Sequence, residues 1–558
     1  MIYHSTRNEQ LTASSTHAVL QGIAPDGGLY ICDPAALHFD WRAALEKDTL
    51  SMAADILHAL LPDFENMEQL VRDSYAGKFP TSDLTPLTPV ADKYVLELYH
   101  GPTSAFKDVA LSVLPRLIVA AAKAEGMKGD VVILTATSGD TGKAAMEGFH
   151  DVPGTRITVF YPHGGVSAVQ QAQMATQEGN NVRVCAVRGN FDDAQTGVKN
   201  IFAACKDRDL HSAMLSSANS INIGRLAPQV VYYFRAYGDL VKAGRIKMGD
   251  VVDYTVPTGN FGDILAGYFA REMGLPVGRL ICASNANDVL TEFLTTGRYD
   301  KRRPFYKTTS PSMDILVSSN LERLLYLVSG DAGYVAQLMA QLNEQGWYQV
   351  SGDILARLQA VFGCGCCNDA GAAEVIGRLW REQKYLCDPH TAVAWSVAES
   401  HTRGEAPMVV LSGSMSGTAE DHIEVGDLIF TKQADIDELK VGDVVAFMDG
   451  SIVVTHRIVS ISADRTEFVT KGDANNTEDE PISADQIIGQ YSGRIPKVGD
   501  FALFLQKPLG MVIFIGVPVC AFVVWDILRR RRETRAGDEE KEQLRRELER
   551  LKAEKPAE

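Results

Sequence analysis

One lysine in this sequence directly follows a turn and directly precedes an apolar helical pattern. Residues 100–108 read His-Gly-Pro-Thr-Ser-Ala-Phe-Lys-Asp, and the apolar run starts at Val109. A lysine that its neighbours partly desolvate at the start of a helix can act as a nucleophile and form a Schiff base with a carbonyl group. Most lysines at helix starts are simply solvated, so Lys107 alone does not distinguish the two cases.

Two loops have the composition of anion-binding turns, and each follows an apolar run typical of a buried strand. Residues 134–142 read Leu-Thr-Ala-Thr-Ser-Gly-Asp-Thr-Gly, and residues 257–263 read Pro-Thr-Gly-Asn-Phe-Gly-Asp. Glycines and small hydroxyl residues between a strand and a helix leave backbone N–H groups free to bind an anion. Either loop alone could be a plain connection. Together with Lys107, the two loops favour a lysine-dependent site that binds two anionic groups.

The elements that position these residues alternate in type over the first 411 residues. Apolar β-branched runs at 131–134, 156–161, 182–187 and 251–256 predict buried strands of a parallel sheet, and longer amphipathic stretches between them predict helices. This α/β alternation places ligand-binding loops at the carboxyl ends of the strands.

The bulk composition excludes several classes of function. A net charge of −17 argues against a nucleic-acid partner. Nine cysteines in 558 residues do not form a disulfide framework. Cys364, Cys366 and Cys367 lie close together, but no second cysteine pair or nearby histidine completes a ligand set, so the sequence predicts no metal site.

Several long segments of residues 1–411 resemble threonine synthase, a pyridoxal-phosphate enzyme of fold type II. They read HGPTSAFKD, TATSGDTGKAA, SANSINIGRLAPQ (217–229), VPTGNFGDILAGYFA (256–270), SNANDVL (284–290), SPSMDI (310–315) and DPHTAVA (388–394). The resemblance implies pyridoxal 5′-phosphate as cofactor and O-phosphohomoserine as substrate, which water converts to threonine and phosphate. No segment at the N-terminus has the pattern of a signal peptide, so we expect this domain in the cytoplasm.

The resemblance also assigns roles to individual residues. Lys107 would hold the cofactor covalently and then transfer protons at the substrate. The loop that matches the cofactor-phosphate site consists of Gly259, Asn260, Phe261, Gly262 and Asp263, and the loop that matches the substrate-carboxylate site consists of Thr137, Ser138, Gly139, Asp140 and Thr141. The polar residues Asn219, Asn222, Arg225 and Asn285 would contact cofactor or substrate; alternatively, they satisfy buried loop backbone.

After residue 411 the pattern changes to short β-rich runs separated by Gly-Asp, Asp-Gly and Lys-Gly turns, which predict a small all-β domain over 412–505. Residues 509–525 carry no charge and Arg529–Arg532 follow. A transmembrane helix over 506–528 with a charged, helical cytoplasmic tail over 529–558 fits this pattern, and a buried core helix is the alternative. We therefore expect a protein anchored to the membrane by one C-terminal helix.

The β-rich part contains a serine, a histidine and acidic residues, the types that acyl transfer needs. Segments in it resemble signal peptidase I of the type with a histidine base: SGSM, VGDLIF, VGDVVAF, VTHRIV, FVTKGDANN and IIGQYSGRIPKVG. The resemblance implies Ser414 as nucleophile and His456 as general base. Asp479 is the implied charge-relay acid, with Asp473 as the competing assignment.

The same resemblance implies that Ser412 and the backbone N–H of Ser414 stabilise the oxyanion, and that the partners are the signal peptides of preproteins.

The two resemblances meet at the run 409–412, which suits both a late strand of the first enzyme and the approach to the peptidase serine. Threonine synthases have a threonine for the pyridine nitrogen where this chain has Gly413, and the peptidases have a membrane helix before SGSM that is absent here. The main interpretation is a threonine-synthase-like lyase fused to a peptidase-like domain. The alternatives are signal peptide cleavage as the principal activity, and a fusion in which both activities are impaired.

Overall fold

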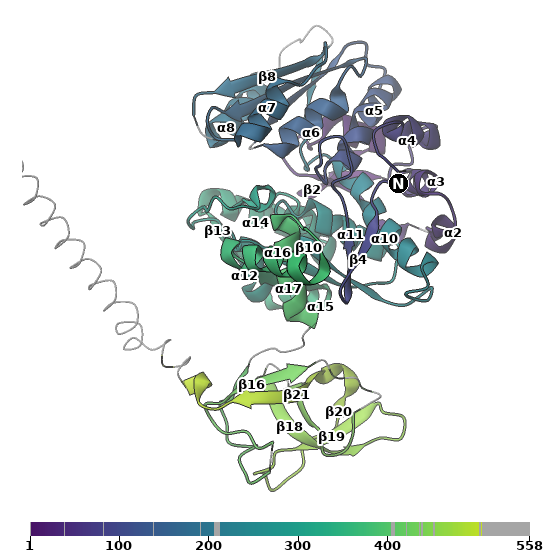
Figure 1. Cartoon of the computed structure of the whole chain (residues 1–558). Coiled ribbons are helices and arrows are strands. Elements are labelled where there is room, and N and C mark those ends of the chain that lie inside the picture. Colours follow the sequence, from purple (N-terminus) through teal and green to yellow (C-terminus); the bar gives the residue numbers. More distant parts are fainter. Residues whose placement is uncertain are drawn as a thin grey trace, which may run out of the picture. The chain divides into compact units, whose positions relative to one another are not determined.

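A computed structural model describes residues 2–500 except 38, 82, 138, 190, 206–212, 403–407, 420, 433, 435, 437–438 and 450–451, and beyond residue 500 it describes only Phe504. The chain divides into two compact units, Met1–Ala398 and Glu399–Glu558 (Figure 1). Each unit is considered by itself.

Two parallel sheets organise the first unit, as the apolar runs predict. One has the order β8-β7-β6-β9, with strands β6 (Val131–Ala136), β7 (Thr155–Pro162), β8 (Val182–Val187) and β9 (Met214–Ser216). The other has the order β10-β11-β14, with strands β10 (Val252–Pro257), β11 (Val277–Ser284) and β14 (Phe362–Cys366). All of these pairings are parallel.

Helices cover these sheets, and Figure 1 shows α6, α7 and α8 beside β8 in one half of the unit and α12, α16 and α17 beside β10 in the other. The helices are α1 (Ser15–Gln21), α2 (Trp41–Leu45), α3 (Thr49–Leu60), α4 (Met67–Tyr75), α5 (Asp108–Ala124), α6 (Asp140–Phe149), α7 (Ala168–Ala175), α8 (Phe191–Cys205), α9 (Ile223–Leu226), α10 (Val230–Lys242), α11 (Gly262–Glu272), α12 (Val289–Thr296), α13 (Leu321–Ser329), α14 (Ala332–Glu344), α15 (Gly352–Val361), α16 (Asp369–Gln383) and α17 (Pro389–Thr402). Because helices pack against them, side chains such as Ile133, Val159 and Leu280 are buried in one continuous core.

Shorter antiparallel sheets complete this unit. They are β2-β1-β3, β4-β5 and β12-β13, built from β1 (Tyr3–Ser5), β2 (Asn8–Ala13), β3 (Tyr30–Ile31), β4 (Leu87–Val90), β5 (Lys93–Leu96), β12 (Arg298–Asp300) and β13 (Trp347–Gln349). The one-turn 3-10 helix η3 (Pro311–Met313) also belongs to the site described below.

The second unit is a seven-stranded antiparallel sheet, which confirms the predicted all-β architecture for the described part of this region. Its order is β15-β16-β21-β17-β18-β19-β20, from β15 (Met408–Val409), β16 (Leu428–Lys432), β17 (Val444–Asp449), β18 (Ile452–Ile461), β19 (Glu467–Lys471), β20 (Ile482–Ser483) and β21 (Ile487–Ile495). Val445, Phe447, Ile458 and Phe468 form its buried core.

The junction between the two units differs from the sequence-based boundary at 411/412. Met408 and Val409 pair with Ile429 and Leu428 of β16, so this run is a strand of the second sheet. The alternative, a late strand of the parallel sheet, is not what the structure contains. An apolar run of this length fits either sheet, and its pairing is decided by tertiary context.

The predicted membrane helix at 506–528 and the predicted tail at 529–558 lie outside the described residues. Within the described part of the chain, no helix is both long enough and apolar enough to cross a bilayer.

Candidate active sites

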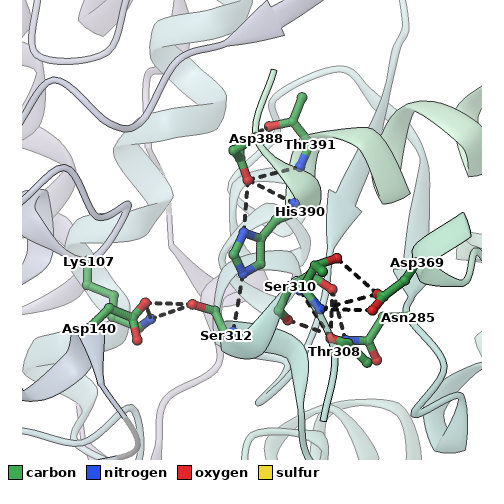
Figure 2. Close-up of polar contacts among 11 residues, drawn as sticks. Lys107, Asp140, Asn285, Thr308, Ser310, Ser312, Asp369, Asp388, His390 and Thr391 are labelled. Atoms are coloured by element: carbon green, nitrogen blue, oxygen red, sulfur yellow. Dashed lines mark hydrogen bonds and ion pairs between the residues drawn. The ribbon is translucent and has the colours of Figure 1, made fainter. Parts of the chain in front are cut away.

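Lys107 occupies the N-cap position of α5 and is 8% exposed. The helix that follows it is buried along Val109, Leu111 and Val113, which fixes the backbone that carries the lysine. Its Nζ donates to Asp140 Oδ2 over 2.6 Å and to Ser312 Oγ over 3.3 Å, and the Ser312 hydroxyl donates to the same Asp140 oxygen over 2.5 Å (Figure 2). Three segments distant in sequence therefore meet at one amine.

Asp140 is the first residue of α6, and its carboxylate is the ionic partner of Lys107. Burial raises the pKa of Asp140, but the charge of Lys107 and the hydrogen bonds from Lys107 and Ser312 outweigh burial and hold the pKa well below its usual value. The sequence groups Asp140 with the loop that would bind the substrate carboxylate, and that role stays a prediction. In the structure its side chain contacts the lysine, which suits a carboxylate better than facing a second one, because two carboxylates repel each other.

The rest of the loop 137–141 holds its own backbone in place. Thr137 Oγ1 accepts hydrogen bonds from the N–H groups of Gly139 and Gly142, over 3.0 and 2.9 Å. Gly139 is the N-cap of α6 and offers no side-chain cap, but Thr137 caps the helix in its place, because its Oγ1 accepts from the Gly142 N–H of the first turn. Thr141 donates its N–H to Asp140, and Ser138 lies outside the described residues.

The loop 259–263 lies at the start of α11. The N-cap is Phe261, buried and left-handed with φ 61°, and it provides no side-chain cap. Gly259 lies so close to η3 that a Cβ there would be 2.8 Å from the Ser312 carbonyl oxygen. Asn260 is anchored through its carbonyl, which accepts from the Asn320 N–H. The N-terminal N–H groups of α11, beginning at Gly262, thus form an uncapped anion site.

Asp263, the last residue of this loop, is partly buried, and loss of solvent around its carboxyl raises the pKa to about 7. Tyr233 donates its hydroxyl to the Asp263 carbonyl over 2.9 Å.

Arg225 is the unusual member of the four polar residues singled out in the sequence. It is 3% exposed, its Nη1 donates to the Ala218 carbonyl over 3.0 Å, and its buried Nε has no hydrogen-bond partner. Burial lowers the pKa of Arg225 to about 10. A buried guanidinium with an unpaired donor is costly, which indicates a site made for an anion.

Two of the three asparagines satisfy loop backbone through their side chains, and for Asn219 only a backbone contact is described. Asn222 caps α9 and donates to the carbonyls of Val19 and Ser217. Asn285 donates to Thr308, Ser310 and Asp314. Asn219 donates its backbone N–H to Ser217 Oγ.

Three residues of the lysine site were not assigned roles from the sequence: Ser312, Asp388 and His390. They lie in the segments 310–315 and 388–394, which were noted only for their resemblance to threonine synthase. The Ser312 N–H donates to His390 Nε2 over 3.2 Å, and His390 Nδ1 lies 2.8 Å from Asp388 Oδ1 (Figure 2).

In the second unit, His456 and Asp479 form a close pair. His456 is 6% exposed, and its Nδ1 lies 2.6 Å from Asp479 Oδ2, which also accepts from the Thr470 hydroxyl over 2.8 Å. Asp473 instead pairs with Arg457, through contacts of 2.9 and 2.7 Å. Of the two acids proposed for the histidine, the structure brings Asp479 to it.

Ser414 lies close to this pair at Gly472. A Cβ built on Gly472 would be 2.6 Å from the Ser414 carbonyl oxygen and 2.9 Å from His456 Nε2. The Ser414 hydroxyl lies 3.4 Å from that of Ser412. Among the described contacts, no hydrogen bond joins the Ser414 hydroxyl to His456, so the predicted nucleophile and the predicted base lie near each other without a hydrogen bond between them.

Comparisons with known proteins match the first unit. One family model, described as pyridoxal-phosphate dependent enzyme, matches residues 82–413, and another, described as threonine synthase N terminus, matches residues 2–75. Threonine synthase of Pseudomonas aeruginosa is 40% identical over 426 residues, which cover 74% of this chain and 87% of that protein. The chain belongs to the threonine synthase family.

Solved structures of this family agree with the fold. A pyridoxal-phosphate-bound threonine synthase from Brucella melitensis superposes with a TM-score of 0.66 at 40% identity, covering 72% of this chain and 85% of that one. The human protein named threonine synthase-like 1 is 36% identical over 71% of this chain, but only 56% of that protein is covered, so the chain spans little more than half the length of such relatives. Neither family model extends beyond residue 413, and the resemblance to signal peptidase I therefore depends on the residues of the second unit alone.

The cofactor of this threonine-synthase-like enzyme is pyridoxal phosphate. The residues present fit it: Lys107 offers a nearly buried amine, and the uncapped start of α11 offers backbone donors for a phosphate.

Proposed function

We propose that the first unit converts O-phosphohomoserine and water to threonine and phosphate. The observation that carries this proposal is the buried amine of Lys107, held by Asp140 and Ser312 in a chain of the threonine synthase family. The uncapped helix start at Phe261 and the unpaired donor of Arg225 provide for an anionic cofactor and a substrate with anionic groups.

Pyridoxal phosphate, when bound, supplies an electron sink for the substrate carbons. Lys107 Nζ would hold the cofactor, and as a free amine it would transfer protons at the α and β carbons of the substrate. Asp140 and Ser312 keep that nitrogen in one position, which limits the motion needed for each transfer. The backbone N–H groups at the start of α11 would hold the cofactor phosphate, and the loop 137–141 would hold the substrate carboxylate, as the resemblance implies.

Arg225 is suited to the remaining anion of the substrate, its phosphate ester. Its Nε–H is buried and unpaired, and a charged acceptor would satisfy it. This role would favour departure of phosphate, because the guanidinium stabilises the charge that develops on the leaving group.

Phosphate release tests this function directly. The full chain, loaded with pyridoxal phosphate, is incubated with O-phosphohomoserine, and phosphate and threonine are measured. We expect equal amounts of both products, abolished in Lys107→Ala and retained in Lys47→Ala, a surface lysine paired with Asp55. A cofactor-loaded protein that releases neither product would overturn the proposal and favour a fusion with impaired activity, as Gly413 in place of the family threonine suggests.

We also propose a second activity, serine endopeptidase cleavage of the signal-peptidase type, in the second unit. The supporting observation is the buried His456–Asp479 pair beside Ser414. Asp479 fixes the ring so that Nδ1 carries hydrogen and Nε2 can accept the serine proton. Ser412 and the Ser414 N–H would then stabilise the oxyanion, after a small movement that brings the Ser414 hydroxyl to His456.

Cleavage of a synthetic preprotein tests the peptidase. We expect loss of cleavage in Ser414→Ala and in Asp479→Asn, while Asp473→Asn keeps the histidine partner and retains cleavage. Equal loss in both aspartate variants would contradict the assignment of Asp479, and cleavage by Ser414→Ala would contradict the peptidase itself.

We also propose that residues 506–528 anchor the protein in the membrane and that both units lie on the cytoplasmic side. Arg529–Arg532 favour this orientation, because basic residues beside a membrane helix are retained in the cytoplasm. Protease added to intact cells should leave residues 420–500 uncut, and their digestion from outside would contradict this topology.

A further inference from the structure

A chain of contacts extends from Lys107 through Ser312 and ends at a histidine and an aspartate (Figure 2). The hydroxyl of Ser312 links Lys107 and Asp140, and the backbone N–H of the same serine donates to His390 Nε2 over 3.2 Å. His390 Nδ1 in turn lies 2.8 Å from Asp388 Oδ1. The lysine environment is therefore connected to His390 through a single residue.

These contacts require one tautomer of His390. Because Nε2 accepts the Ser312 N–H, it carries no hydrogen, so the hydrogen of the neutral ring is on Nδ1 and is donated to Asp388. Asp388 is itself fixed, since it accepts from the Thr391 hydroxyl over 2.6 Å and from the His390 N–H over 2.8 Å. A protonated ring would place a donor opposite the Ser312 N–H and break the connection.

Ser312 contacts both the lysine and the loop 259–263 at the start of α11. Its hydroxyl accepts from Lys107 and donates to Asp140, which uses its one hydrogen fully. Its carbonyl lies against Gly259 of the loop at α11, where a Cβ would be 2.8 Å away. A displacement of Ser312 would therefore disturb the lysine and the phosphate loop together.

We propose that His390 is a positioning residue for Lys107: as a neutral ring oriented by Asp388, it holds Ser312 so that the serine hydroxyl bridges Lys107 and Asp140. His390 reaches the lysine only through Ser312 and needs no contact with substrate. The inference rests on the proposed lyase function, but what it predicts concerns only Lys107 and the cofactor. The charged groups connected to the ring are Asp388 directly and Asp140 and Lys107 through Ser312.

Two measurements on the full chain test this role. In the wild-type protein, the ring ¹⁵N shifts of His390 should show hydrogen on Nδ1 and a bare Nε2 at neutral pH. In the cofactor-loaded protein, the pH midpoint of the visible cofactor absorption should shift by about one unit in His390→Ala, the size expected for loss of one hydrogen bond in a charged network. In His390→Gln, the side-chain oxygen can accept the Ser312 N–H, so the midpoint should return most of the way to the wild-type value.

The matched control is His150→Ala, which removes a histidine paired with the partly exposed Asp151 and should leave the midpoint unchanged. Hydrogen on His390 Nε2 in the wild type would overturn the proposal, and so would a His390→Ala midpoint equal to that of wild type. If His390→Ala does not fold, the tautomer measurement still decides. A shifted midpoint in a protein that releases no phosphate would refute the lyase function while supporting the role of His390.

Discussion

Replacing Asp140 by asparagine should slow the capture of the cofactor by Lys107. In the wild type, the Asp140 carboxylate lies 2.6 Å from Lys107 Nζ and, together with Ser312, holds that nitrogen in one position. A hydrogen bond to a charged group contributes about 1.5–3 kcal/mol, and we take about 2 kcal/mol because the Asp140 side chain is 32% exposed. At 1.36 kcal/mol for each factor of ten in rate, capture should slow by about thirtyfold.

The assay is the rate of pyridoxal phosphate uptake, followed by visible absorption at one fixed pH. The matched control is Asp130→Asn, which removes a carboxylate from the exposed Arg156 and should leave the rate unchanged. An unchanged or raised rate in Asp140→Asn would refute the reasoning that the carboxylate positions the lysine.

The same variant should alter the pH dependence of stability. Although burial raises the pKa of Asp140, Lys107 and Ser312 hold it below its usual value in the folded protein. Its contribution to the free energy of unfolding is therefore present at neutral pH and is lost as pH falls below about 4. Unfolding by urea at several pH values should show a steeper acid decline in wild type than in Asp140→Asn.

Three further predictions concern stability and the second unit. Asn222→Ala removes the cap of α9 and leaves the buried Val19 carbonyl unpaired, so urea unfolding should show a free energy of unfolding lower by about 2 kcal/mol. The control, Asn8→Ala on the exposed β2, should lower it by less than about 0.5 kcal/mol. Burial raises the pKa of Asp263 to about 7, so the stability that its protonated form contributes is lost as pH rises from about 4 through 7. In the cofactor-free protein, Asp263→Asn should remove that decline from the free energy of unfolding. A decline that persists in the variant would contradict this prediction. Thr470→Val removes the hydroxyl that fixes Asp479 and should slow preprotein cleavage about fivefold, the equivalent of about 1 kcal/mol; an unchanged rate would show that Asp479 needs no such support.

The parts of the site that the sequence predicts are local ones. Each belongs to a short strand–loop–helix or turn–helix segment: Lys107, the loop at Gly139 and the loop at Phe261. The composition of each segment alone indicates either a helix start without a capping side chain at its N-cap or a lysine at a helix start. The same holds for the parallel strands, since buried β-branched runs have a recognisable length and pattern.

The parts that the sequence does not predict depend on distant contacts. Ser312 meets Asp140 across 172 residues and His390 across 78, and no local pattern in a single sequence indicates such a pairing. The choice between Asp473 and Asp479 has the same origin, because Arg457 on a neighbouring strand takes Asp473 and leaves Asp479 for His456. The pairing of β15 with β16 was equally open, since a short apolar run fits either sheet.

The central claim is that Lys107 is the cofactor lysine of a threonine-synthase-like enzyme. Borohydride reduction of the full chain with bound pyridoxal phosphate, followed by peptide mass analysis, tests it most directly. We expect one modified peptide, carrying the reduced cofactor on Lys107, and none from Lys107→Ala. Modification of another lysine in the wild type, or cofactor that remains unattached, would contradict it.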